Sequence, residues 1–499
     1  MNQLLPTLSL TKSVSRNTEV VVVGFTHVSD APTLVGVSSD LEKSYQKKFG
    51  TSVLDLATDL GADAKRETVR VLPSAGQRLV VVGLGDADVT PEGLRCSLGN
   101  AMRAINKLPG ENAFSVAVSL ETADPELIKA AGEGALLGNY QIEKVTGEPT
   151  PNRVNAIEIV SSSTRAEAKD ALAAAQTVAS AVCQARDWVN TPPNLLYPET
   201  FAASARALAK DVRIDVEVLD ERALERGGYG GVLAVGGGSS RGPRVVRYEY
   251  KPRGASFHLA LVGKGVTFDS GGLDIKPANG MGTMKCDMSG AAAVLAAVRA
   301  IAELGLKIHV TGYAGMVENL PSSTAYRSSD VLTMFGGKTV ENMNTDAEGR
   351  LVMADLIARA GTESPDMIVD VATLTGACMV ALGLRTAGLM ASDDDTADRV
   401  LDAAETAGED FWQLPIPEHI DKALDSKIAD MRSTSGDRYG GALAAGAFLH
   451  RFVPQGVAWA HLDIAGPAFN DKSEFDYVPV GGTGSGVRTL VALAQSLSS

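Results

Sequence analysis

Short apolar segments alternate with segments of helical periodicity along most of this 499-residue chain, and this alternation limits the fold more than any other feature. Residues 20–23 and 79–83 predict buried strands, whereas residues 93–107 and 125–137 predict helices. Such alternation is typical of α/β domains. Because the chain is too long for one ordinary domain, we predict an α/β fold of two domains. Each is expected to be a mixed, mostly parallel sheet flanked by helices, and the C-terminal domain to be the larger.

A long alanine-rich helix is predicted to link the two domains. Its start has the pattern of a capped helix at residues 161–167, and the prolines that follow Thr191 end it. Further strands at 113–118 and 156–160, with a loop at 147–152, precede this helix. The sequence therefore predicts three parts, which are an N-terminal α/β domain at 1–162, a linking helix at 163–190 and a C-terminal domain at 191–499.

The C-terminal domain carries the stronger strand signals. Residues 257–262 predict a strand that ends in a turn at Gly263-Lys264-Gly265, and residues 289–304 predict a helix. Three more strands are predicted at 307–316, 366–374 and 457–464. In open α/β sheets, sites form beyond the carboxyl ends of the strands. Four residues are expected just past such ends, namely Lys264, Asp269, Thr373 and Ala465.

Composition excludes several classes of function. Asp and Glu number 60 against 46 Lys and Arg, for a net charge of −14, and no basic patch interrupts this acidity, so nucleic acid and anionic membranes are not expected partners. No segment has the roughly 20 apolar residues of a membrane span, and the first ten residues lack the pattern of a signal peptide. The 4 cysteines form no CxxC pair. We therefore expect a reduced, cytoplasmic protein.

The residues most suited to chemistry are acidic and lie among glycines. In an extended Asp346-Ala347-Glu348-Gly349-Arg350, alternate side chains would share one face, and Gly349 would let other atoms approach the backbone. Two carboxylates on one face raise each other's pKa unless a cation lies between them. Taken alone, this stretch is also compatible with a solvated turn that holds one ion pair.

Two further aspartates upstream complete a possible metal cluster. Asp269, Asp287, Asp346 and Glu348 together carry four negative charges, which two divalent cations would neutralise. Lys264 could be a ligand only without its proton, although an ordinary ion pair is the simpler reading of this lysine alone. The 6 histidines are scattered and no HExxH occurs, so a mononuclear zinc site bound by histidines is not expected.

Several motifs resemble the leucyl (cytosol) aminopeptidase family of metallopeptidases. The stretch Asn344-Thr345-Asp346-Ala347-Glu348-Gly349-Arg350-Leu351 is similar to the signature octapeptide of that family. The similarity extends to residues 262–272, 190–194, 372–376 and 484–488, and so covers the chain from about Arg186 to its end. The N-terminal third matches only in general character.

The resemblance implies a site with two divalent metals, Mn²⁺ or Zn²⁺ and possibly Mg²⁺. Asp269 and Glu348 would bridge the metals, Lys264 and Asp287 would complete the tighter site, and Asp346 the more exchangeable one. A hydroxide bridging the metals would attack the first peptide bond of a peptide whose N-terminus is unblocked. The catalytic residues implied are Lys276, which would stabilise the oxyanion, and Arg350, which would hold a bicarbonate ion as general base.

The resemblance also implies a substrate pocket and an assembly. The pocket for the N-terminal side chain, expected to prefer leucine and other apolar residues, would be lined by Met284, Thr373, Gly376, Ala465 and Ala468. Ala468 stands where some relatives have methionine, which predicts a wider pocket. Relatives form hexamers, so a homohexamer acting on peptides is expected. At Ser433, Thr434 and Asp437 the chain departs from the family's usual glycine- and asparagine-rich loop.

Two alternatives belong to other classes of protein. Gly83-Leu84-Gly85-Asp86 and Gly236-Gly237-Gly238 suggest a nucleotide-binding enzyme, but neither completes a GxGxxG or GK[ST] motif. The N-terminal domain could also be an assembly or binding module without catalysis. The cluster of carboxylates favours a metal-dependent hydrolase over both alternatives. The family resemblance implies that it is an aminopeptidase that contributes to intracellular peptide and protein turnover, with catalysis in the larger domain.

Overall fold

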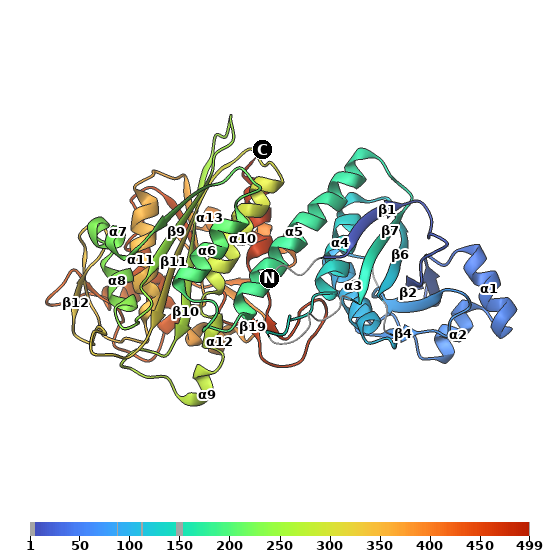
Figure 1. Ribbon diagram of the computed structural model, residues 1–499, viewed down its shortest axis with the longest axis horizontal. Helices are drawn as coiled ribbons and strands as arrows, with labels where there is room; N and C mark the ends of the chain where they lie inside the picture. Colours follow the sequence, from blue (N-terminus) through green and yellow to red (C-terminus); the bar gives the residue numbers. More distant parts are fainter. Residues whose placement is uncertain (1–4, 87, 111–112, 146–152, 499) are drawn as a thin grey trace. The chain divides into compact units, whose positions relative to one another are not determined.

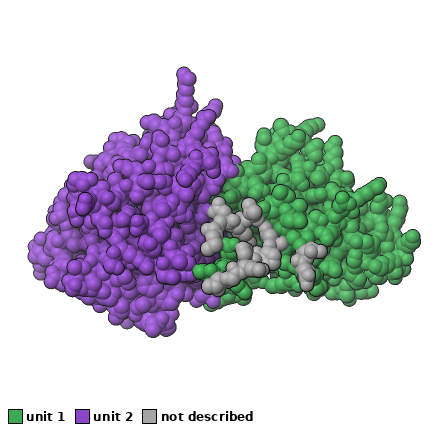
Figure 2. All heavy atoms as spheres, viewed as in Figure 1, with its two compact units in different colours: residues 1–183, 472–480 green, residues 184–471, 481–499 purple. Residues whose placement is uncertain are grey.

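The computed structural model describes residues 5–86, 88–110, 113–145 and 153–498 (Figure 1). The predicted loop at 147–152 lies outside the described residues. The chain divides into two compact units (Figure 2). The first consists of Met1–Cys183 with Lys472–Val480, and the second of Gln184–Asp471 with Gly481–Ser499.

The first unit is built on a seven-stranded mixed sheet. Its strands in spatial order are β1 (Thr7–Thr11), β7 (Val154–Ser161), β6 (Phe114–Thr122), β2 (Val20–Val28), β5 (Arg78–Gly83) and β4 (Val69–Val71), with β3 (Ala31–Val35) paired to β2. The β3 and β4 pairings are antiparallel and the other four are parallel. The valines at 20–23 of β2 and at 80–82 of β5 are buried, which confirms the predicted strands.

The helices of this unit begin where the sequence places capping residues. They are α1 (Ser39–Phe49), α2 (Val53–Asp59), α3 (Pro91–Asn106), α4 (Pro125–Gly138) and most of α5 (Ala166–Asn190). The Thr90 side chain accepts a hydrogen bond from Gly93 N at the start of α3, and Asp124 accepts one from Glu126 N at the start of α4. A proline is the first residue of both helices, where its missing N–H is not needed.

A short segment from near the C-terminus, Lys472–Val480, belongs to the first unit. The Tyr477 hydroxyl donates to Glu92 Oε1 (2.8 Å), and Asn100 Nδ2 donates to Asp476 Oδ1 (3.1 Å). Gly99 permits this contact, because a Cβ atom there would lie 2.6 Å from Tyr477 N. The first unit is therefore discontinuous in sequence.

The second unit is built on an eight-stranded mixed sheet. Its strands in spatial order are β16 (Phe411–Gln413), β15 (Ala387–Ala391), β18 (Ala458–Asp463), β14 (Met367–Ala372), β10 (His258–Asp269), β11 (His309–Asn319), β9 (Arg244–Tyr250) and β8 (Asp215–Leu219). The four neighbours β18, β14, β10 and β11 are parallel. Their carboxyl ends consequently lie at one edge. The predicted two-domain α/β class, with mixed and mostly parallel sheets, is confirmed.

Helices cover both faces of this sheet (Figure 1). The helices are α6 (Pro198–Leu208), α7 (Glu221–Gly227), α8 (Gly230–Gly236), α9 (Ala278–Met281), α10 (Ser289–Glu303), α11 (Glu348–Gly361), α12 (Gly376–Leu382), α13 (Asp394–Ala407), α14 (Glu418–Lys422), α15 (Gly441–His450) and α16 (Val487–Ser496), with a 3₁₀ turn at Met284–Cys286. Five short strands form two small ladders, β12 (Val331–Thr333), β13 (Thr339–Glu341) and β17 (Met431–Arg432), and β19 (Phe469–Asn470) with β20 (Gly481–Gly482). No helix within the described ranges is long and apolar enough to cross a membrane.

The turn predicted at Gly263-Lys264-Gly265 is wrong, because β10 continues through it to Asp269. Neither glycine has a positive φ. Both allow close packing instead, since a Cβ on Gly263 would lie 2.6 Å from Ala291 Cα of α10 and one on Gly265 would lie 2.6 Å from Gly315 O of β11. Lys264 therefore projects from within a central strand, and Asp269 is the residue that ends it.

The two glycine-rich stretches that suggested nucleotide binding are also places of close backbone packing. A Cβ on Gly83 would lie 2.1 Å from Lys65 O, and one on Gly238 would lie 2.0 Å from Leu320 O. These contacts account for the glycines without a bound phosphate.

Candidate metal centre

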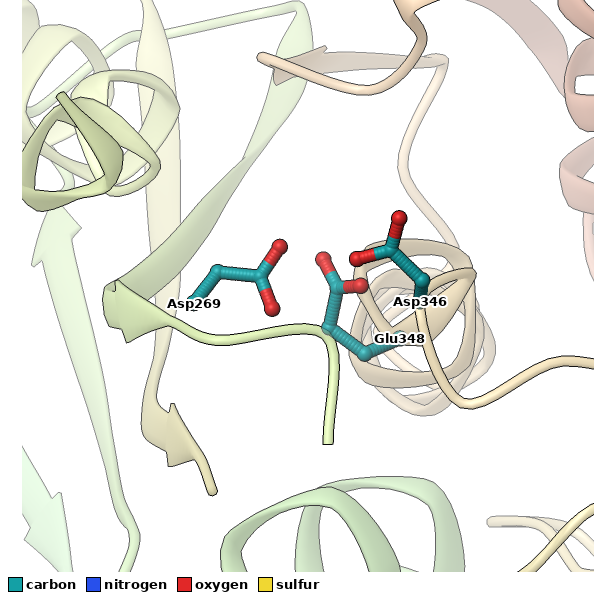
Figure 3. Close-up of side chains that lie close together, drawn as sticks. All are labelled: Asp269, Asp346 and Glu348. Atoms are coloured by element: carbon teal, nitrogen blue, oxygen red, sulfur yellow. The ribbon is translucent and has the colours of Figure 1, made fainter. Parts of the chain in front are cut away.

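Four carboxylate side chains converge at the carboxyl edge of the second sheet. Asp269 ends β10, Asp287 follows the 3₁₀ turn, and Asp346 and Glu348 lie at the start of α11. Oxygen atoms of Asp269, Asp346 and Glu348 lie within 4.8 Å of one another. Figure 3 shows these three carboxylates turned toward each other. Asp346 keeps a third of its side chain exposed, whereas the other three are buried.

The local conformation that brings Asp346 and Glu348 together differs from the expected one. The sequence predicted an extended stretch with Asp346, Glu348 and Arg350 on one face, but Glu348 is the first residue of α11. Successive residues of a helix are about 100° apart around its axis, so Glu348 and Arg350 point in different directions. Glu348 faces the carboxylates, and Arg350 Nη1 donates instead to the Ser433 carbonyl (2.8 Å).

Two lysine ammonium groups lie among the carboxylates. Lys264 Nζ is 2.8 Å from both Asp287 Oδ1 and Glu348 Oε1 and donates to Thr373 O (3.0 Å). Lys276 Nζ is 2.7 Å from Asp269 Oδ2 and 2.5 Å from Asp346 Oδ1. Four carboxylates and two ammonium groups leave two formal negative charges, so the cluster can accept further positive charge.

Burial and mutual repulsion control the pKa values in this cluster. Burial raises the pKa of Asp287 well above its usual range, and the neighbouring Glu348 and Asp269 charges raise it further against the effect of Lys264. The pKa of Asp269 is raised by burial and by Glu348. For Lys264 burial acts to lower the pKa, but Asp287 and Glu348 raise it overall, so the ammonium form is favoured.

Two buried carboxylate oxygens without hydrogen-bond partners indicate whether metal ions fit this cluster. Within the part of the chain that the structure describes, Asp287 Oδ2 and Glu348 Oε2 are buried and have no hydrogen-bond partner. A buried carboxylate oxygen without a partner raises the free energy of the folded protein, because it has lost its contacts with water. A cation bound to the oxygen would offset this loss. Clustered carboxylates are the ligands preferred by Mg²⁺ and Mn²⁺ and also bind Zn²⁺. The donor set therefore fits divalent metals.

Asn319 and Thr345 support the cluster and were not predicted. Asn319 Nδ2 donates to Asp269 Oδ1 (2.8 Å) and to Thr345 O (2.9 Å). Gly271 N also donates to Asp269 Oδ1 (2.8 Å), which leaves Oδ2 directed at Lys276. Asn319 pairs with Asp269 in the parallel register of β10 and β11. Its position at the end of the neighbouring strand was the available sequence signal.

Gly349 is needed where Lys264 passes the start of α11. A Cβ atom at Gly349 would lie 2.5 Å from Lys264 Cε and 2.7 Å from Nζ. The expectation that this glycine permits a close approach is thus confirmed. Lys264 could make room only by leaving its three partners.

Gly349→Ala is therefore expected to weaken metal binding at least about tenfold and to destabilise the unit by about 1–3 kcal/mol, as overpacking does. Helix propensity alone would predict the opposite change, because alanine in place of glycine stabilises a helix by up to about 1 kcal/mol. Metal titration and thermal unfolding check both effects. Gly280→Ala is the control, since a Cβ there would meet nothing within 4 Å. Equal behaviour of the two variants would contradict the packing argument.

Arg350 places a buried positive charge beside the cluster. It is 8% exposed, and burial lowers its pKa to about 10, with Glu348 and Asp463 acting in the opposite direction. Among the described residues, its Nε has no hydrogen-bond partner. Ser433, one of the departures from the family's loop, supplies its carbonyl acceptor through the backbone. The guanidinium can therefore take an anion as a further partner.

The predicted pocket residues lie on segments around the carboxylates. Met284 is half-buried in the 3₁₀ turn before Asp287. Thr373 and Gly376 follow β14, and Ala465 and Ala468 follow the adjacent β18, with Ala468 only 2% exposed. The Thr373 hydroxyl donates to Asp287 Oδ1 (2.8 Å), so this residue contacts the cluster directly.

Metal affinity is expected to increase with pH. Burial raises the pKa values of Asp269, Asp287 and Asp346, so the metal-free cluster keeps protons at pH values above the ordinary range of about 4. A metal must displace these protons, and its affinity rises up to about tenfold per pH unit for each proton released. Calorimetric Mn²⁺ titration in two buffers of different ionisation enthalpy measures the release. Affinity that is constant from about pH 5 to 7.5 would contradict the expectation.

Comparisons with known proteins agree with this geometry. The sequence profile of the cytosol aminopeptidase family matches residues 183–491 with its catalytic domain and residues 22–148 with its N-terminal domain. A probable cytosol aminopeptidase of Cutibacterium acnes is 51% identical over 489 residues, covering 97% of this chain and 96% of that protein. One from Streptomyces avermitilis is 47% identical, with 98% of each chain covered.

Two solved structures are similar over almost the whole chain. Tomato leucine aminopeptidase has a TM-score of 0.86 and 30% identity, covering 99% of this chain and 97% of its own. The bottromycin maturation enzyme BotP, in complex with Mn, has a TM-score of 0.84 and 37% identity, covering 97% of this chain and 100% of its own.

Proposed function

Since the chain belongs to the cytosol aminopeptidase family and is therefore a metal-dependent aminopeptidase, we propose that it hydrolyses the first peptide bond of peptides with an unblocked N-terminus. Leucine and other apolar N-terminal residues are the preferred substrates. The enzyme contributes to intracellular peptide and protein turnover in the cytoplasm. Its net charge of −14 disfavours the binding of nucleic acid.

One observation supports this proposal most strongly. Buried carboxylate oxygens of Asp287 and Glu348 lack partners in the described chain, in a cluster that retains two formal negative charges beside its lysines. A cluster of this kind is stable when cations bind it. BotP, a relative with 37% identity, binds Mn, which supports Mn²⁺ as a suitable ion here.

Five residues would hold two metals. Asp269 and Glu348 would serve both ions, and Asp346 would complete one of the two sites. Asp287 would complete the other site together with Lys264, once that lysine has lost the proton that it holds in the metal-free cluster. The partial exposure of Asp346 supports its assignment to the exchangeable site. Bound divalent cations would supply a nucleophile near neutral pH by lowering the pKa of water, and would polarise the scissile carbonyl.

Lys276 and Arg350 would assist the hydrolysis of the substrate. The Lys276 ammonium lies at the rim, with 17% of its side chain exposed, and would stabilise negative charge that develops on the carbonyl oxygen. Arg350 would hold a bicarbonate ion through its guanidinium, whose Nε lacks a partner among the described residues. A bicarbonate bound there would accept and return a proton during hydrolysis.

The residues that follow β14 and β18 would form the substrate pocket. The N-terminal side chain would be surrounded by Thr373, Gly376, Ala465 and Ala468, together with Met284 of the 3₁₀ turn. The family resemblance extends the proposal to a homohexamer.

Metal analysis and turnover together test this function. Purified enzyme should contain up to two Mn²⁺ or Zn²⁺ per subunit, cleave leucine anilide, lose activity on chelation and regain it with metal. N-acetyl-leucine anilide is the matched control and should remain uncleaved. Turnover that survives complete chelation, or equal cleavage of the acetylated substrate, would overturn the proposal. Thermal stabilisation by ATP or NAD without an effect of Mn²⁺ would instead favour a nucleotide enzyme.

A further inference from the structure

Asp463 is a buried carboxylate at the end of a strand next to the metal centre. It is the last residue of β18, is 0% exposed and pairs with Ala372 at the end of the parallel strand β14. Two loops leave the sheet at this point, one after Ala372 and one after Asp463. The Asp463 side chain lies between their first residues.

This one carboxylate accepts hydrogen bonds from both loops. Asp463 Oδ1 accepts from Leu374 N (3.1 Å) and from Ala465 N (3.1 Å), and Oδ2 accepts from the Thr375 hydroxyl (2.8 Å). Thr375 Oγ1 in turn accepts from Cys378 N and caps α12. Because a buried carboxylate is costly without donors, these contacts fix the two loops relative to each other.

The two loops carry the residues assigned to the substrate pocket. The first loop holds Thr373, whose carbonyl accepts from Lys264 and whose hydroxyl donates to Asp287. The second loop begins with Ala465 and leads to the buried Ala468. A shift between the loops would therefore change the separation of the pocket walls, and Thr373 would transmit it to Lys264 and Asp287.

We propose that Asp463 is a positioning residue that sets the width of the pocket for the N-terminal side chain, by holding the loops after β14 and β18 in register. The inference rests on the proposed aminopeptidase function, from which the pocket assignment comes. Asp463 would affect the shape of the pocket through the hydrogen bonds that it accepts from the two loops.

Asp355 provides a matched comparison within the same unit. It is also 0% exposed, and it also joins two backbone segments, since it accepts from Val232 N (2.9 Å) and Phe335 N (2.8 Å). Neither of those segments carries a residue assigned to the pocket. Burial raises the pKa of Asp355 to about 7, so the two carboxylates are best compared at about pH 8.

The test is the selectivity of Asp463→Asn. An amide nitrogen cannot accept, so at least one of the three donors loses its acceptor and the loops are free to shift. The ratio of kcat/KM between leucine and alanine anilides is expected to change at least about tenfold, since one methylene in an apolar pocket is worth about 10–200-fold. Asp355→Asn should lower Tm and leave this ratio unchanged.

A second pair of variants covers the case in which Asp463→Asn does not fold. Thr375→Val removes one of the three contacts and should shift the ratio in the same direction, whereas Thr375→Ser keeps the hydroxyl and should restore it. An unchanged ratio in Asp463→Asn, or in Thr375→Val if the former does not fold, would overturn the inference. So would an equal change in Asp355→Asn. Wild-type protein without metal-dependent turnover would instead overturn the proposed function.

Discussion

Lys276→Ala is expected to lower kcat by about 10²–10³ while the protein keeps its metal, which is the range found when one oxyanion donor is removed. The ammonium at 2.7 Å from Asp269 and 2.5 Å from Asp346 competes with a cation for the same oxygens, so its removal should not weaken metal binding. Arg350→Ala should behave similarly, because Arg350 Nη1 is bonded to the Ser433 carbonyl rather than to a carboxylate of the cluster. Elemental analysis and steady-state kinetics on leucine anilide measure both quantities.

Two controls sharpen this prediction. Lys276→Arg keeps the positive charge and should retain more activity than Lys276→Ala. Lys307→Ala changes an exposed lysine and should behave as wild type. Metal loss in both Lys276→Ala and Arg350→Ala would show that these residues support the structure of the centre and do not act on the substrate.

Lys264→Met should remove metal from the centre and also destabilise the metal-free protein, by about 3–5 kcal/mol as when one partner of a buried ion pair is lost. Methionine has similar length, but it leaves Asp287 and Glu348 without the cation that lies 2.8 Å from each. Lys264 acts to lower the pKa of Asp287, so without it this carboxyl group would take up a proton. The loss of stability should therefore be larger at about pH 8 than at about pH 5. Thermal unfolding at both pH values, with and without Mn²⁺, measures the effect.

Lys285→Met is the matched control for Lys264→Met. Lys285 donates to the Asn190 carbonyl (2.7 Å) and has no carboxylate partner among the described residues. Its replacement should leave metal content near that of wild type. If Lys264→Met retained full metal content and a wild-type response of Tm to Mn²⁺, the role of Lys264 as a ligand would be wrong.

The strands and helices followed from periodicity, but two local conformations did not. Gly263 and Gly265 favour a turn when only neighbouring residues are considered, yet they lie within β10 because Ala291 and Gly315 approach them from other elements. The extended conformation predicted for Asp346–Arg350 gave way to the start of α11. In β10 the tertiary contacts outweighed the local preference of the two glycines.

Some residues of the site could be identified from the sequence, and others only from the pairing of the strands. The four carboxylates and two lysines could be chosen from charge and from resemblance, because their chemical type reveals them. Asn319 and Asp463 could not, since each is an ordinary polar residue until the parallel register places it beside Asp269 or Ala372. Supporting residues of this kind become predictable once the strand order is known.

The nine residues from Lys472 to Val480 also limit how relatives can be recombined. A chimaera that exchanges only residues 1–183 would keep the host's Asp476 and Tyr477. These two residues would then have to form their hydrogen bonds with residues of the other relative at positions 100 and 92. Grafts should therefore transfer both stretches together. The same segment implies that the first unit, most of which leaves the ribosome first, cannot complete its fold until nearly the whole protein has been synthesised.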